Sequence, residues 1–160
     1  MTETTRETTR TAPAPDRSAG LDGTIYAVEA LSTGGGRDGH VRTADGAVDL
    51  EMRAPRELGG SGEGNNPEQL FAAGFAACFH SALLGAARRQ KVDVSGSTVG
   101  ARVSLLPVEG GIDLAVHLEV ALPGVRADEA QTLAAAAHKA CPYSRATRGN
   151  IRVTVDVVDD

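Results

Sequence analysis

Residues 66–83 read NPEQLFAAGFAACFHSAL, a stretch that combines a helix start with an almost uncharged helical run. Asn66 can cap a helix, Pro67 suits its first position, and Gln69 stands where a capping box needs an amide. The stretch predicts a helix that ends near Arg89. Because this helix is apolar around most of its circumference, one sheet cannot cover it. We therefore expect an obligate homodimer, in which central helices pack between sheets.

The length of the chain favours one domain. With 160 residues it can form a single compact unit, predicted here at residues 21–160. Residues 1–20 are polar and contain proline, which predicts a flexible tail. The core has to be built from Ala, Val, Leu and Ile, because the sequence holds only 3 Phe, 2 Tyr and no Trp.

Charge and cysteine usage exclude several classes of protein. A net charge of −5 without a basic cluster argues against a nucleic-acid binder. Two cysteines are too few for a disulfide-stapled secreted scaffold, and no apolar segment opens the chain, so we expect a cytoplasmic protein. The uncharged run 70–87 almost reaches the length of a membrane span, but its Ala, Gly, His and Ser content favours a core helix.

The segments around the long helix predict strands and one further helix. Before it, residues 24–30 predict a strand, residues 33–39 a glycine-rich break, and Asp45-Gly46 a turn between strands at 40–43 and 47–52. After it, the alternation predicts an antiparallel hairpin at 99–105 and 114–120, a helix from near Asp128 to Pro142, and a last strand at 151–157. This order of elements is an α+β pattern.

Cys78 in the apolar helix and Cys141 at a helix end are the candidate reactive groups. A thiol with an ordinary pKa of about 8.5 is mostly protonated at pH 7, and burial makes its ionisation harder. A reactive Cys78 therefore needs a cation, and Arg37 is the candidate because the glycines around it let the backbone fold inward. Glu68 could hold that guanidinium by a bidentate pair. Cys141 could move as a resolving thiol must.

The residues alone leave other interpretations open. Cys78 could simply fill space in the core, and Arg37 could be solvated on an ordinary surface loop. A Cys–His hydrolase would leave Cys141 without a role. No metal site is expected, because none of the four histidines has a ligand spacing with either cysteine: His40, His80, His117 and His138.

Three segments resemble the organic hydroperoxide resistance (Ohr) family, within the wider group of OsmC proteins: GGRDG at 35–39, residues 66–79, and CPYS at 141–144 with ATRGN at 146–150. The likeness extends from about residue 22 to 158. The CPYS and GRDG segments favour the hydroperoxide branch. The resemblance implies an OsmC-like α+β fold, antiparallel sheets that enclose central helices, and an intertwined homodimer with active sites at the subunit interface.

The resemblance also implies a thiol-dependent peroxidase for organic, including lipid-derived, hydroperoxides. By this likeness Cys78 is the peroxidatic thiolate, Cys141 the resolving thiol, and Arg37 with Glu68 the activating pair. Such proteins bind no metal or organic cofactor, and a dithiol such as dihydrolipoamide or a lipoylated protein recycles them. The candidate apolar lining of the substrate pocket is Phe71, Phe75, Phe79 and Tyr143.

Two alternative functions remain open: an OsmC-like peroxidase of broader range, and a non-catalytic carrier of hydrophobic ligands.

Geometry adds one expectation about the activating pair. Glu68 and Cys78 are ten positions apart, which on a straight helix is about 15 Å along the axis. An Arg37 side chain that contacts both would have difficulty spanning this distance. Either the first turn of the helix bends, or the carboxylate comes from the helix of the other subunit, and we expect the second arrangement.

Overall fold

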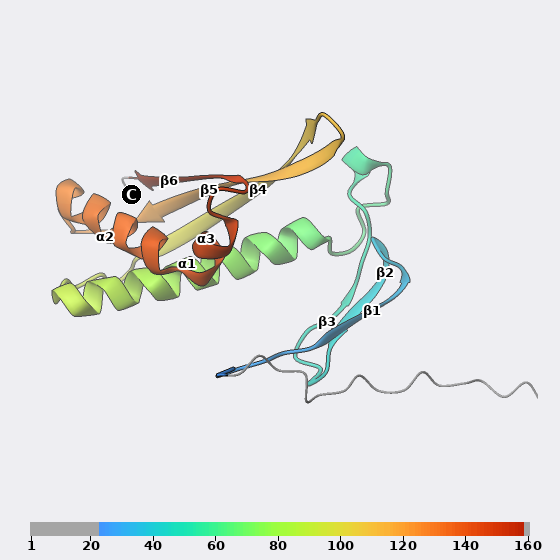
Figure 1. Ribbon diagram of the computed structural model, residues 1–160, viewed down its shortest axis with the longest axis horizontal. Coiled ribbons are helices and arrows are strands. Elements are labelled where there is room, and N and C mark those ends of the chain that lie inside the picture. Colours follow the sequence, from blue (N-terminus) through green and yellow to red (C-terminus); the bar gives the residue numbers. More distant parts are fainter. Residues whose placement is uncertain (1–22, 159–160) are drawn as a thin grey trace, which may run out of the picture.

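The computed structural model describes residues 23–158, so the predicted tail at residues 1–20 lies outside the described part. Two three-stranded sheets are separated in sequence by a long helix (Figure 1). The elements in chain order are β1 (Ala30–Gly35), β2 (Asp38–Thr43), β3 (Asp49–Glu51), a 3-10 turn η1 (Arg56–Leu58), α1 (Pro67–Gln90), β4 (Thr98–Val108), β5 (Gly111–Ala121), α2 (Ala127–Ala140), α3 (Pro142–Thr147) and β6 (Arg152–Val158). The α+β class is confirmed.

The second sheet carries the main body of the molecule. Its order is β4-β5-β6, with β4 and β5 antiparallel as predicted. Strands β5 and β6 are parallel, so this sheet is mixed and not antiparallel throughout as the resemblance implied. The parallel pairing is possible because α2 and α3 form the crossover between these two strands. Helices α1 and α2 pack against each other and against this sheet, whereas β1-β2-β3 stands to one side of the body (Figure 1).

The core lies between α1, α2 and the inner face of the second sheet. Its fully buried side chains are contributed by α1, β5, α2 and the joint after α2: Phe75, Phe79, Leu83, Leu118, Val120, Leu133, Ala137 and Cys141. Apart from two phenylalanines these are small or aliphatic groups, so the helices can approach closely. Cys141 therefore belongs to the packed core, which fixes its position.

The predicted start of α1 is confirmed in detail. The Asn66 side chain accepts from the Gln69 backbone N–H, and the Gln69 side chain accepts from the Asn66 backbone N–H, each at 2.9 Å. Pro67 is the first helical residue and needs no donor there. The helix ends at Gln90, one residue beyond the expected end.

One stripe of α1 remains uncovered by the rest of the chain. Its members lie at three- and four-residue spacing, so they share one face: Leu70, Ala73, Ala77, Ser81 and Leu84. Helix α1 also passes a length and composition test for a membrane span, with a mean hydropathy of 1.7, and 28% of that window is buried. Such a test is passed by core helices as well, and α1 packs on β4 and α2.

Two predictions for the N-terminal part are wrong. Residues 24–29 form no strand, and β1 begins at Ala30. The glycine-rich segment 33–39 does not break regular structure but forms the end of the β1–β2 hairpin, with Gly34 opposite Gly39. A Cβ on Gly39 would lie 2.1 Å from the Thr33 carbonyl oxygen, so only glycine permits this close pairing.

The joint after α2 also differs from the prediction. Helix α2 begins at Ala127, with Arg126 at the N-cap without a capping side chain, one residue before the expected start. Pro142 ends this helix as predicted, but it also begins the short helix α3. Proline is favoured at a first helical position for the same reason that it stops a helix, since it has no N–H to donate.

Candidate active site

The two thiols lie side by side although 63 residues separate them in sequence. Cys141 is buried, Cys78 is half-buried, both are free, and their Sγ atoms are 3.5 Å apart. A disulfide needs about 2.05 Å between the sulfurs. A side-chain movement of about 1.5 Å would therefore bring them to bonding distance, which is a small change for a pair on separate elements.

Backbone hydrogen bonds connect Cys141 to the helices on both sides of it. Its backbone N–H donates to the Ala137 carbonyl at 2.8 Å, and its carbonyl accepts from the Arg145 N–H at 3.0 Å. Its own ψ of 123° is not helical, so the chain changes direction at this residue. The thiol is thus held at the corner between α2 and α3.

Three influences act on the pKa of the Cys78 thiol within residues 23–158. Burial raises the pKa above its ordinary value, the backbone N–H of Tyr143 lowers it by donating to the sulfur, and the Cys141 thiol raises it again. The net direction is upward, so in the isolated chain Cys78 is protonated at neutral pH. The contribution of Tyr143 was not foreseen from the sequence, although a free N–H is expected at the start of a helix that follows Pro142.

Arg37 and Glu68 form the bidentate pair that was predicted. Arg37 Nη1 donates to Glu68 Oε2 at 2.8 Å and Nη2 to Oε1 at 2.6 Å. The hydrogen bond from Arg37 lowers the pKa of the Glu68 carboxyl, which outweighs the effect of burial. The side chains are 43% and 16% exposed, so the pair contributes little to stability and mainly fixes the guanidinium in place.

The structure does not bring this ion pair to the Cys78 of its own chain. Helix α1 is continuous from Pro67 to Gln90, which places Glu68 about 15 Å from Cys78 along the axis. Arg37 is not among the described groups that shift the pKa of Cys78. Helix α1 runs straight from its first turn (Figure 1), so the alternative of a bent first turn does not apply. The two thiols of one chain are therefore close together, but among residues 23–158 no cation is among the groups that shift the pKa of Cys78.

A cluster of aromatic rings from α1 and α3 lies next to the thiol pair. Tyr143 stacks on Phe71, with centroids 5.9 Å apart, and meets Phe75 edge-on at 5.6 Å. Gly74 leaves room for this ring, because a Cβ there would lie 3.1 Å from the Tyr143 hydroxyl. Phe75 and Phe79 are fully buried, so they support the site from within the core, whereas Tyr143 is 39% exposed. Of the four predicted lining residues, Tyr143 and the half-buried Phe71 are accessible.

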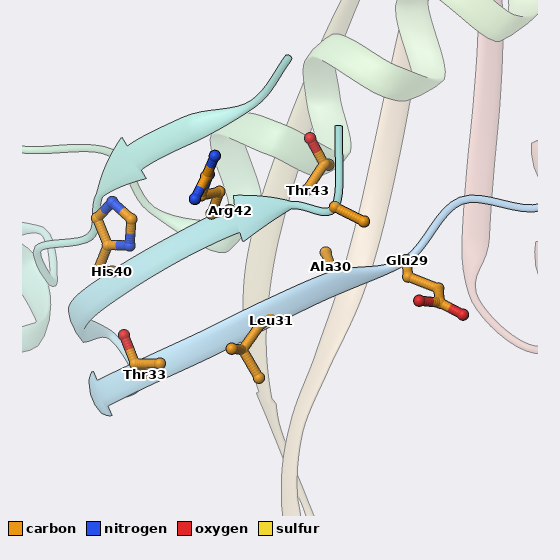
Figure 2. A pocket seen from close by; sticks show the side chains of 8 residues that line it. Glu29, Ala30, Leu31, Thr33, His40, Arg42 and Thr43 are labelled. Atoms are coloured by element: carbon orange, nitrogen blue, oxygen red, sulfur yellow. The ribbon is translucent and has the colours of Figure 1, made fainter. Parts of the chain in front are cut away.

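A separate hollow of about 700 Å³ lies on the face of β1 and β2 (Figure 2). Its lining comes from the strands and the segments next to them: Glu29, Ala30, Leu31, Thr33, His40, Arg42, Thr43 and Ala44. None of these is a predicted site residue. Leu31 is 67% exposed there.

The four histidines have other partners than the thiols. Three of them bond to neighbouring side chains away from the site: His40 to Asp49, His80 to Ser97, and His117 to Thr154. His138 alone lies near Cys141, and its ring bonds to Ser144. Within residues 23–158 no group of three His, Cys, Asp or Glu side chains is arranged to hold a metal ion.

Known proteins are similar to this chain in both fold and sequence. The family model for OsmC-like protein matches residues 60–156. The organic hydroperoxide resistance protein of Xanthomonas axonopodis pv. citri is 46% identical over 133 residues, which are 82% of this chain and 93% of that protein. The organic hydroperoxide resistance protein OhrB of Bacillus subtilis is 42% identical over 125 residues, 77% of this chain and 91% of that protein. A crystal structure of an organic hydroperoxide resistance protein from Legionella pneumophila superposes with a TM-score of 0.80 at 46% identity, covering 84% of this chain and 98% of that one.

Proposed function

Since this chain belongs to the OsmC-like family, in its organic hydroperoxide resistance branch, we propose that it reduces organic hydroperoxides to alcohols through Cys78 and Cys141. The observation that carries the proposal is the 3.5 Å approach of the two sulfurs. A ligand carrier would have no use for a second thiol in reach of the first. The apolar, accessible rings of Phe71 and Tyr143 favour an alkyl peroxide over a small polar one.

The chemistry proceeds in three balanced steps. The Cys78 thiolate attacks the terminal oxygen of the hydroperoxide, the O–O bond breaks, and the alkoxide leaves as an alcohol after taking up a proton. Cys78 is then a sulfenic acid. The Cys141 thiol attacks that sulfur and releases water, which gives a Cys78–Cys141 disulfide. An external dithiol, for which we propose dihydrolipoamide or a lipoylated protein, reduces the disulfide by exchange and is itself oxidised.

The first step needs a thiolate, and in the part of the chain that the structure describes no cation lowers the pKa of Cys78. We propose that Arg37, held by Glu68, reaches the Cys78 of a partner subunit and lowers the pKa of that thiol. Two observations support this arrangement: the ion pair forms within one chain, and α1 is too long between Glu68 and Cys78 for the pair to act on its own chain. Arg37 would also stabilise the charge that develops on the leaving oxygen.

A homodimer accounts for the surfaces that one chain leaves uncovered. The exposed stripe of α1 centred on Ala77 is apolar, and small side chains there allow a second helix to pack closely. The hollow on the face of β1 and β2, which Leu31 lines, is a second surface that a partner could cover. Both surfaces fit the expectation that central helices pack between sheets of two chains.

An Ala77→Glu variant tests the dimer. A carboxylate in the middle of an apolar helix interface is buried without a partner, so the dimer dissociation constant should rise at least about a hundredfold. Sedimentation velocity at micromolar concentration measures it. Gln90→Glu is the matched control, because it places the same group on the opposite side of α1 and should leave the assembly unchanged. Equal assembly of the two variants would contradict the interface.

Mass spectrometry tests the proposed reaction directly. One equivalent of tert-butyl hydroperoxide should convert the reduced protein to a species lighter by two hydrogen atoms, and peptide mapping should find Cys78 joined to Cys141. Dihydrolipoamide should restore the original mass. A protein of unchanged mass, or one in which the cysteines stay unlinked, would be incompatible with the peroxidase cycle.

A further inference from the structure

Besides the backbone bonds of Cys141 itself, two hydrogen bonds of His138 hold the joint between α2 and α3. In a regular helix the carbonyl of residue 138 would accept from the N–H of residue 142, but residue 142 is proline and has none. Arg148 supplies the missing donor: its Nη2 lies 3.0 Å from the His138 carbonyl oxygen. A side chain that follows α3 therefore bonds to the C-terminal end of α2.

The His138 ring forms a second hydrogen bond across the joint between α2 and α3. Its Nδ1 lies 3.1 Å from the Ser144 hydroxyl, and Ser144 is fully buried in α3. Burial and the nearby Arg148 charge lower the pKa of His138, so the ring is neutral at pH 7 and the bond is one between neutral groups. His138 thus holds residues on both sides of Cys141 through its main chain and its side chain.

The same ring also touches the helix that carries the other thiol. Its centroid lies 6.4 Å from that of Phe79, which directly follows Cys78 in α1. His138 is therefore in contact with both elements whose spacing determines the distance between the sulfurs. Its ring is part-buried, so the contact is maintained by packing and not only by hydrogen bonds.

We propose that His138 is a positioning residue for the resolving step: with Ser144 and Arg148 it holds the α2–α3 joint so that the Cys141 thiol stays within reach of Cys78. The inference rests on the proposed peroxidase function. Peroxide attack occurs at Cys78 and does not involve the Cys141 thiol. Tyr143 donates to the Cys78 sulfur through its backbone N–H, and its ring packs on Phe71 and Phe75, so its position does not depend on His138 alone. Loss of His138 should therefore slow disulfide formation more than it slows the oxidation of Cys78.

Single-turnover measurements separate the two steps. The reduced protein is mixed with one equivalent of tert-butyl hydroperoxide, quenched at intervals with a sulfenic-acid trap, and analysed by mass spectrometry. In His138→Leu and Ser144→Ala, disulfide formation should be about tenfold slower, which corresponds to the loss of about one hydrogen bond. Trapped Cys78 sulfenic acid should accumulate, and excess peroxide should drive more of it to sulfinic acid.

Two further variants distinguish positioning from a general structural role. His138→Asn keeps a polar atom near the place of Nδ1 and should recover most of the rate of disulfide formation. Lys139→Leu, an exposed neighbour on α2, is the matched control and should behave as the unaltered protein. If His138→Leu does not fold, Arg148→Met decides, because it removes only the bond to the exposed end of α2 and should slow the same step to a smaller degree.

The outcomes differ clearly. Disulfide formation at the unaltered rate in folded His138→Leu, Ser144→Ala and Arg148→Met would overturn the inference. So would a parallel slowing of both steps, or no recovery in His138→Asn, since these indicate a structural role alone. If the unaltered protein itself forms no disulfide, the proposed function fails and not merely the role of His138.

Discussion

A Cys78→Ser variant is expected to lose at least about a thousandfold in kcat/KM for tert-butyl hydroperoxide, because it lacks the nucleophile. A serine hydroxyl does not ionise near neutral pH, and it cannot form the sulfenic acid on which the cycle depends. The substitution replaces a half-buried sulfur by a smaller atom, so the fold should persist. Turnover is measured in an assay coupled to the oxidation of dihydrolipoamide.

Cys141→Ser is the companion variant, and it should fail at a different step. Its first turnover should proceed at close to the unaltered rate, after which Cys78 remains a sulfenic acid and turnover with the lipoyl dithiol stops. Sustained turnover in Cys141→Ser would remove the resolving role. Activity retained in Cys78→Ser would instead favour the carrier of hydrophobic ligands.

The choice of peroxide separates the two enzymatic readings. With the unaltered protein, tert-butyl hydroperoxide should react faster than hydrogen peroxide, because the accessible rings beside the thiols give an alkyl group apolar contacts. Equal rates would point to the OsmC-like peroxidase of broader range.

The sequence predicted α1 well because local interactions determine its start. Asn66, Pro67 and Gln69 satisfy the first turn among themselves, independently of any other part of the chain. Residues 24–29 show the opposite case. Ile25 and Tyr26 have the side chains of a strand, but β-propensity reflects packing against neighbours, and in the single chain both residues are largely exposed.

The sequence motifs identified the individual site residues, but they did not determine the distances between these residues in the folded chain. Nothing in the spacing of Cys78 and Cys141 fixes their separation in space, and only the family resemblance indicated that they pair. The sequence indicated for His138 only that it has no metal-ligand spacing with either cysteine. Its role at the joint follows from Pro142 four positions later, a signal that is present in the sequence but has meaning only once α2 is known to end there.

Mixed dimers should show that Arg37 of one subunit serves Cys78 of the other. In a dimer that carries Arg37→Met on one chain and Cys78→Ser on the partner, one site would combine an intact Cys78 with an intact Arg37 from across the interface. Such a dimer should keep about half of the activity, since Met removes the charge but preserves most of the side-chain volume. A same-chain arrangement predicts almost none.

The complementary dimer reverses these expectations, which makes the pair of measurements decisive. When both substitutions lie on one chain and its partner is unaltered, a cross-subunit Arg37 leaves no complete site. The only intact Cys78 then faces a methionine, and activity should fall by about a hundredfold, the usual cost of losing a preorganised charge at a reacting centre. Half activity in this second dimer, with almost none in the first, would assign Arg37 to its own chain. It would then require the β1–β2 hairpin to leave Glu68 and move along α1 to reach Cys78, since the observed bidentate pair holds the guanidinium at the far end of the helix.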